Sequence, residues 1–78
     1  MKINAEKLKK SREAIGYTKE LLALNTNLTR QHIDRLENEK VWITLKTLQI
    51  IINELNKSNK KTGLKLPLLE INDFLIVE

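Results

Sequence analysis

The chain has 78 residues, of which 41% are hydrophobic and 31% charged, with a formal net charge of +4 and no cysteine. This length predicts one small domain, alone or with a tail, and the absence of cysteine excludes disulfides and thiolate metal sites. The basic balance favours a polyanionic partner such as nucleic acid or an anionic membrane, although a charge of this size is also common on ordinary soluble surfaces.

Several function classes find no support in the residues. No stretch resembles a signal peptide, and no segment approaches the ~20 apolar residues of a membrane span. There is one histidine, no glycine-rich phosphate loop and no convincing acid–base pair, which argues against an enzyme. We therefore expect a cytoplasmic protein that is not an enzyme, needs no cofactor or metal and does not enter a membrane.

A first helix is predicted over residues 5–15. Asn4 is a suitable N-cap, and Gly16 ends the helix as glycine commonly does after a last turn. The apolar stripe of this helix consists of Leu8, Ala14 and Ile15.

Two short amphipathic segments follow, separated by the polar break 25–27. Thr18 caps a second helix over residues 19–24, and Asn27 tolerates the left-handed conformation that the turn requires. The expected inner side of this helix consists of Leu21, Leu22 and Ala23.

The third helix is predicted to start after the capping residue Thr29 and to reach Glu37 or Asn38. Only Ile33 and Leu36 are apolar within it, so most of its side chains should face outward. A helix that presents arginine and glutamine side chains has dimensions that fit the major groove of DNA.

After a loop, Thr44 caps a fourth helix predicted over residues 45–55. Its inner positions are Leu45, Leu48, Ile51, Ile52 and Leu55. We divide the chain into a domain of residues 1–56, a polar linker of residues 57–63 and an apolar tail of residues 64–78. Pro67 disfavours a helix interior or a central strand in the tail, where a strand or hairpin and a short helix remain alternatives.

The register from Gly16 to Leu55 resembles, without a gap, that of the Cro/repressor-type helix-turn-helix family of phage and bacterial regulators, and the resemblance covers roughly residues 3–56. The matching positions are Gly16, Thr18, Lys19, Leu22, Ala23, Leu28, Thr29, Ile33, Leu36, Glu37, Thr44, Leu45, Leu48, Ile51 and Leu55. The resemblance implies a mainly α, lambda-repressor-like domain of four to five helices. It also implies a partly buried ion pair between Arg12 and Glu37. The usual fifth helix is not recognisable after Leu55, where the short apolar extension follows.

The outward residues of the third helix are the candidates for reading base edges. Arginine can bind guanine O6 and N7, and glutamine can bind adenine N6 and N7. The base-contact candidates are Arg30, Gln31, His32 and Arg35. The phosphate-contact candidates are Thr18, Lys19, Thr29 and Lys40. Asp34 could accept from cytosine or orient Arg30 or Arg35, although a solvated carboxylate is the more common case.

The resulting hypothesis is a transcriptional regulator that binds double-stranded DNA, acting as a repressor and as a homodimer on a palindromic operator. The apolar tail is the expected dimerisation element. Its contact candidates are Leu66, Leu68, Ile71, Phe74 and Ile76. The alternative is an antitoxin-like or other interaction module whose tail binds a partner protein.

Overall fold

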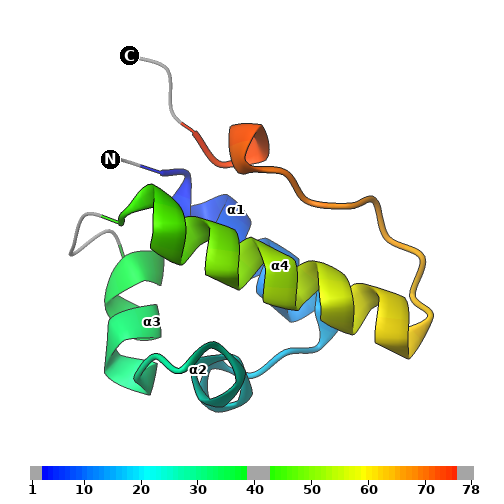
Figure 1. Ribbon diagram of the computed structural model, residues 1–78, viewed down its shortest axis with the longest axis horizontal. Coiled ribbons are helices and arrows are strands. Elements are labelled where there is room, and N and C mark those ends of the chain that lie inside the picture. Colours follow the sequence, from blue (N-terminus) through cyan, green and yellow to red (C-terminus); the bar gives the residue numbers. More distant parts are fainter. Residues whose placement is uncertain (1–2, 39–42, 76–78) are drawn as a thin grey trace.

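The computed structural model describes residues 3–38 and 43–75, and over these the chain is mainly helical. The helices are α1 (Ala5–Ile15), α2 (Lys19–Thr26), α3 (Arg30–Glu37) and α4 (Leu45–Thr62), followed by a 3₁₀ helix (Ile71–Asp73). Figure 1 shows α4 crossing the molecule with α1 behind it, α2 and α3 on one side and the tail along the other.

The start of each α-helix is stabilised by the residue expected from the sequence. Asn4 Oδ1 accepts from the Lys7 N–H at 3.1 Å, and the hydroxyls of Thr18, Thr29 and Thr44 accept from the N–H three residues later at 3.0–3.1 Å. Each cap pairs one of the N–H groups that a helix leaves without an internal partner. The predicted starts of all four helices are confirmed.

Left-handed residues end the first two helices. Gly16, with φ 81°, closes α1 as predicted, and Asn27, with φ 60°, has the predicted left-handed conformation directly after α2. The predicted end of α2 at Leu24 is two residues short, because the helix continues to Thr26. The Thr26 hydroxyl donates to the Leu22 carbonyl at 2.7 Å, so its polar group is satisfied within the helix.

The predicted end of α4 at Leu55 is wrong. The helix continues to Thr62 and ends at Gly63, which has φ 71°. Residues 57–62, expected as part of a polar linker, are therefore helical. No glycine or proline interrupts them, and lysines in the last turn interact favourably with the negative end of the helix dipole.

The tail lies against the domain through side chains of α4 and through Phe74. The Asn59 amide accepts from the Leu66 N–H at 3.1 Å and donates to the Leu66 carbonyl at 2.8 Å. Asn56 does the same with Leu69, at 2.8 and 2.9 Å. These two asparagines thus take the place of a neighbouring strand for an extended segment. In the described part of the tail the chain forms no hairpin, and the short-helix alternative is correct only for the 3₁₀ helix Ile71–Asp73.

The core combines all four α-helices with one tail residue. Phe74 is fully buried, and its carbonyl accepts from the Asn4 N–H at 2.7 Å. The largest fully buried side chains are Leu8, Leu22, Ile33, Leu36, Leu48, Ile51, Ile52, Leu55 and Phe74. Three positions expected to face inward are instead exposed, namely Ala14, Leu21 and Leu45.

Candidate nucleic-acid interface

The outer side of α3 presents the side chains that were predicted to reach base edges. Arg30, Gln31 and Arg35 are exposed and His32 is half-buried. The opposite side of the same helix buries Ile33, Leu36 and Glu37. The structure therefore brings the four base-contact candidates together on one helix whose apolar side chains lie in the core.

Helix α2 supports α3 from behind. Leu22 and Ala23 of α2 belong to the same core cluster as Ile33 and Leu36 of α3. The turn between the helices is closed by the Leu28 N–H, which donates to the Ala23 carbonyl at 3.0 Å. The two helices therefore pack together as one unit.

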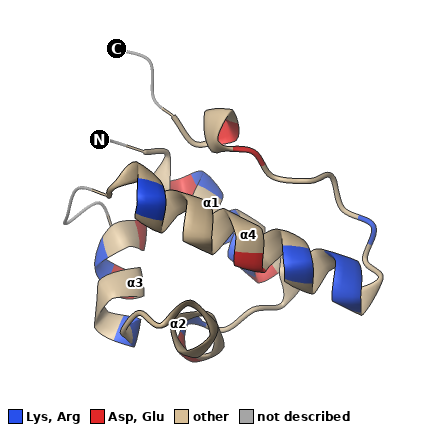
Figure 2. Cartoon of the chain, in the orientation of Figure 1, with Lys and Arg blue, Asp and Glu red and all other residues tan. Residues whose placement is uncertain are grey.

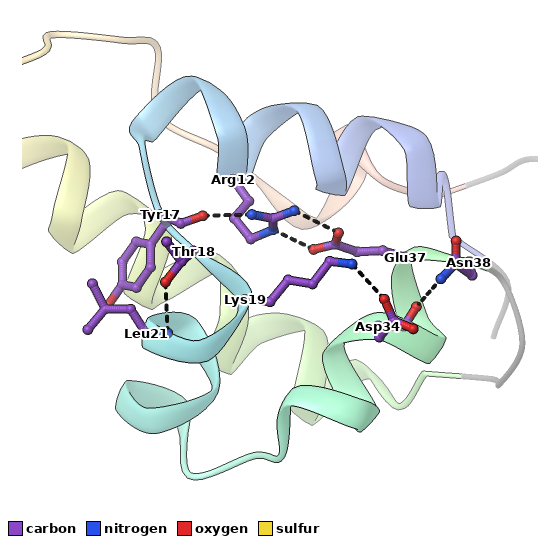
Figure 3. A network of polar contacts seen from close by, with 8 residues as sticks. All are labelled: Arg12, Tyr17, Thr18, Lys19, Leu21, Asp34, Glu37 and Asn38. Carbon is purple, nitrogen blue, oxygen red and sulfur yellow. Dashed lines mark hydrogen bonds and ion pairs between the residues drawn. The ribbon is translucent and has the colours of Figure 1, made fainter.

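A buried ion pair joins α1 to the end of α3, as the resemblance implied. Arg12 donates to Glu37 through Nε at 2.7 Å and through Nη2 at 3.0 Å, and it donates to the Tyr17 carbonyl through Nη1 at 2.7 Å. The two side chains are only 8% and 1% exposed. The Glu37 carboxylate raises the pKa of Arg12, so the guanidinium is charged at every accessible pH. Figure 3 shows Arg12 lying between Tyr17 and Glu37.

A second ion pair joins α2 to α3 on the outer surface. Lys19 Nζ donates to Asp34 Oδ1, and Figure 3 shows these side chains pointing toward each other. Hydrogen bonding to Lys19, and then its charge, lowers the pKa of Asp34. Asp34 therefore pairs with Lys19, and not with Arg30 or Arg35, the partners that its sequence position suggested.

Glu20 and Arg30 form a similar pair between the same two helices, with Nε and Oε1 at 3.0 Å. Both side chains are more than half exposed. These two cross-helix pairs were not predicted. The paired residues are ten and fifteen positions apart in the sequence, so their contact cannot be predicted unless the packing angle of α2 and α3 is known.

The phosphate-contact candidates gather at two helix starts. Thr18 and Lys19 lie at the start of α2, and Thr29 lies at the start of α3. Each threonine pairs only the third N–H of its helix, so the first two N–H groups have no partner within the described residues. These two N–H groups lie at the positive end of the helix dipole. Lys40 lies outside the described residues.

A polar network that the sequence did not reveal positions α2 on α4. The Asn25 amide donates to the Tyr17 hydroxyl oxygen, and the hydroxyl donates to Glu54 Oε1 at 2.7 Å. Burial is the main cause that raises the pKa of Tyr17, so its hydroxyl remains a donor at neutral pH. Tyr17 thereby links the start of α2 to the middle of α4.

Positive charge is spread over several helices of the molecule. Figure 2 shows basic residues on α1, on α3, at the start of α4 and on the last turns of α4. Within the described residues, no group of three or more histidine, cysteine, aspartate or glutamate side chains could hold a metal ion. No helix among them is long and apolar enough to cross a membrane.

A comparison with protein-family models matches residues 8–58, more than half of the chain, to a helix-turn-helix family. Searches among curated proteins and among solved structures gave no match. The matched residues begin in α1 and end within α4, so they include the Arg12–Glu37 pair, the α2–α3 unit and its outward side chains. The chain belongs to the Cro/repressor-type (XRE) helix-turn-helix family, whose function is that of a DNA-binding transcription regulator.

Proposed function

We propose that this regulator is a sequence-specific repressor that places α3 in the major groove of double-stranded DNA. The observation that supports the proposal most is the exposure of Arg30, Gln31 and Arg35 on a helix whose other side is buried in the core. An α-helix fits the major groove, and base edges there present a distinct pattern for each base pair.

Each exposed side chain has a defined role in this arrangement. Arg30 and Arg35 bind guanine, and Gln31 binds adenine, while the half-buried His32 contacts a neighbouring base or phosphate. The Arg30–Glu20 ion pair does not prevent this, because a pair between exposed side chains contributes only about 0–1 kcal/mol. Arg30 is therefore able to exchange Glu20 for a base.

Backbone contacts set the position of α3 in the groove. The unpaired N–H groups at the start of α2 bind one phosphate, together with Thr18 and Lys19, and Thr29 binds another. Lys40 belongs to the same proposal as a loop cation. These contacts orient the protein but read no sequence.

A homodimer on a palindromic operator is part of the same proposal, since one helix reads few base pairs and two-fold pairing places half-sites about one turn, ~34 Å, apart. In the tail, Leu66 and Leu68 are 37% and 70% exposed, which supports them as dimer contacts. Ile71 is partly buried and Ile76 lies outside the described residues. Phe74 is a correction to the predicted dimer contacts, because it lies in the core of its own chain.

Selection of bound sequences from random duplex DNA tests this function. We expect the selection to enrich a palindromic sequence.

Affinity for this sequence is then measured with variants of the reading helix. We expect Arg30→Ala or Gln31→Ala to lower the affinity by about 1–3 kcal/mol and to relax the base preference at one position of each half-site. Lys61→Ala is the matched control for the loss of one positive charge. No enrichment, or equal losses in the control, would contradict the proposal.

The tail is tested by molecular mass in solution. We expect the wild type to have the mass of a dimer, and Leu68→Asp to have that of a monomer with an unchanged helical spectrum. A wild-type monomer would contradict the homodimer. If that monomer captured a separate protein through the same residues, the alternative of a partner-binding tail would replace it.

A further inference from the structure

The outward surface of α2 and α3 contains carboxylates as well as cations. Its described cations are Lys19, Arg30 and Arg35, and two of these three bind a carboxylate of the neighbouring helix. Asp34, one of the two carboxylates, lies on the reading helix itself, among the residues proposed to face DNA. The surface is therefore much less positive in the free protein than its lysine and arginine content indicates.

The Lys19–Asp34 pair is the less exposed of the two. The Lys19 side chain is 26% exposed and that of Asp34 is 49% exposed, whereas Arg30 and Glu20 are 65% and 62% exposed. The Asp34 backbone is also held, because the Asn38 amide donates to its carbonyl at 2.9 Å. The ammonium group of Lys19 thus donates to the Asp34 carboxylate, which α3 carries on a helical backbone.

A carboxylate and a phosphate oxygen compete for the same ammonium group. When an unpaired lysine contacts a DNA phosphate, one condensed counterion is released, which favours binding at low salt. When the lysine must first leave a carboxylate, that carboxylate becomes an unpaired anion near the DNA. The electrostatic gain of the phosphate contact is then largely cancelled.

We propose that Asp34 is a specificity-determining residue that holds Lys19 in the unbound protein and so lowers the affinity for DNA of arbitrary sequence. This inference rests on the proposed DNA-binding function. Binding to arbitrary DNA depends almost entirely on phosphate contacts, whereas binding to the cognate site also gains base contacts. Weakening one phosphate contact therefore removes a larger share of the non-specific binding than of the specific binding.

The experiment measures binding of a random-sequence duplex by wild type, Asp34→Asn and Glu6→Gln over a range of salt concentrations. Glu6 is the matched control, because it forms an exposed ion pair with Lys10 at 3.0 Å on α1 and its substitution changes the net charge equally. We expect Asp34→Asn to bind at least about threefold more tightly at low salt. Its slope of log affinity against log salt should be steeper by about 0.9. Glu6→Gln should leave the slope at the wild-type value.

A second pair of variants separates the role of Lys19 from a general charge effect. In a Lys19→Gln background, adding Asp34→Asn should leave the salt slope unchanged, because the cation that Asp34 holds is gone. An unchanged slope in Asp34→Asn alone, or an equal change in Glu6→Gln, would overturn the inference while the DNA-binding function stands. A wild type that binds no duplex at low salt would overturn both.

Discussion

Three ion pairs join α3 to the helices that precede it, and two of them, Arg12–Glu37 and Lys19–Asp34, differ clearly in burial. Arg12 and Glu37 are almost fully enclosed, and each of the three guanidinium nitrogens of Arg12 donates to an oxygen. Asp34 lies one turn before Glu37 on α3, and the Asp34 side chain and that of its partner Lys19 on α2 are 49% and 26% exposed. The two ion pairs therefore have different roles. The buried pair fixes the position of α3, whereas the more exposed pair can exchange its partner.

The difference follows from the cost of removing charge from water. A buried ion pair whose partner is lost leaves an uncompensated charge in the interior, whereas an exposed ion is rehydrated at little cost. Glu37 thus depends on Arg12 in a way that Asp34 does not depend on Lys19.

The largest effect should come from removing the buried cation. We expect Arg12→Ala to lower the free energy of unfolding by about 3–5 kcal/mol, because Glu37 and the Tyr17 carbonyl lose their partner. Lys19→Ala, the matched removal of the exposed cation, should change it by less than about 1 kcal/mol. Urea denaturation followed by circular dichroism measures both. Equal losses in the two variants would remove the distinction between the pairs.

A smaller effect is expected when both buried charges are removed together. The free energy of unfolding of the double variant Arg12→Met, Glu37→Met should lie within about 2 kcal/mol of the wild-type value. No buried charge remains in this variant, and only the Tyr17 carbonyl lacks its donor. The same denaturation measurement applies. A double variant as unstable as Arg12→Ala would mean that the bidentate geometry, and not charge compensation, holds α3.

The smallest effect concerns the contribution of the Lys19–Asp34 pair to stability at acidic pH. Lys19 lowers the pKa of Asp34 in the folded protein. This contribution to stability is present above the unfolded pKa of about 3.9 and is lost as pH falls through the lower folded value. Asp34→Asn should therefore lose less stability than wild type between pH 5 and pH 2, when melting is compared at each pH. Parallel pH profiles would show that the pair contributes nothing.

Local signals in the sequence predicted the helix starts and two of the turns. Asn4, Thr18, Thr29 and Thr44 act through hydrogen bonds three residues away, so neighbouring residues alone identify them. The length of α4 was not predictable in this way. Asn59 lies in a polar stretch that resembles a linker, and its burial becomes evident only when the tail folds back on it.

The candidate site was predicted in its residue types but not in its pairing. The hydrophobic pattern of α3 indicated which side faces outward, and the exposed Arg30, Gln31 and Arg35 agree with it. The pairing of Lys19 with Asp34 depends on how α2 crosses α3. The residue pattern of a single helix gives no information about that crossing. The burial of Phe74 likewise depends on a contact between the two ends of the chain.

The most direct test of the account is an NMR titration of the protein with the duplex obtained by selection, followed through the backbone amides. We expect the largest shifts at the starts of α2 and α3 and along the outer side of α3, at Lys19, Arg30, Gln31 and Arg35, with little change in the middle of α4. Large shifts confined to the tail or to α1, with α3 unchanged, would contradict the placement of α3 in the major groove.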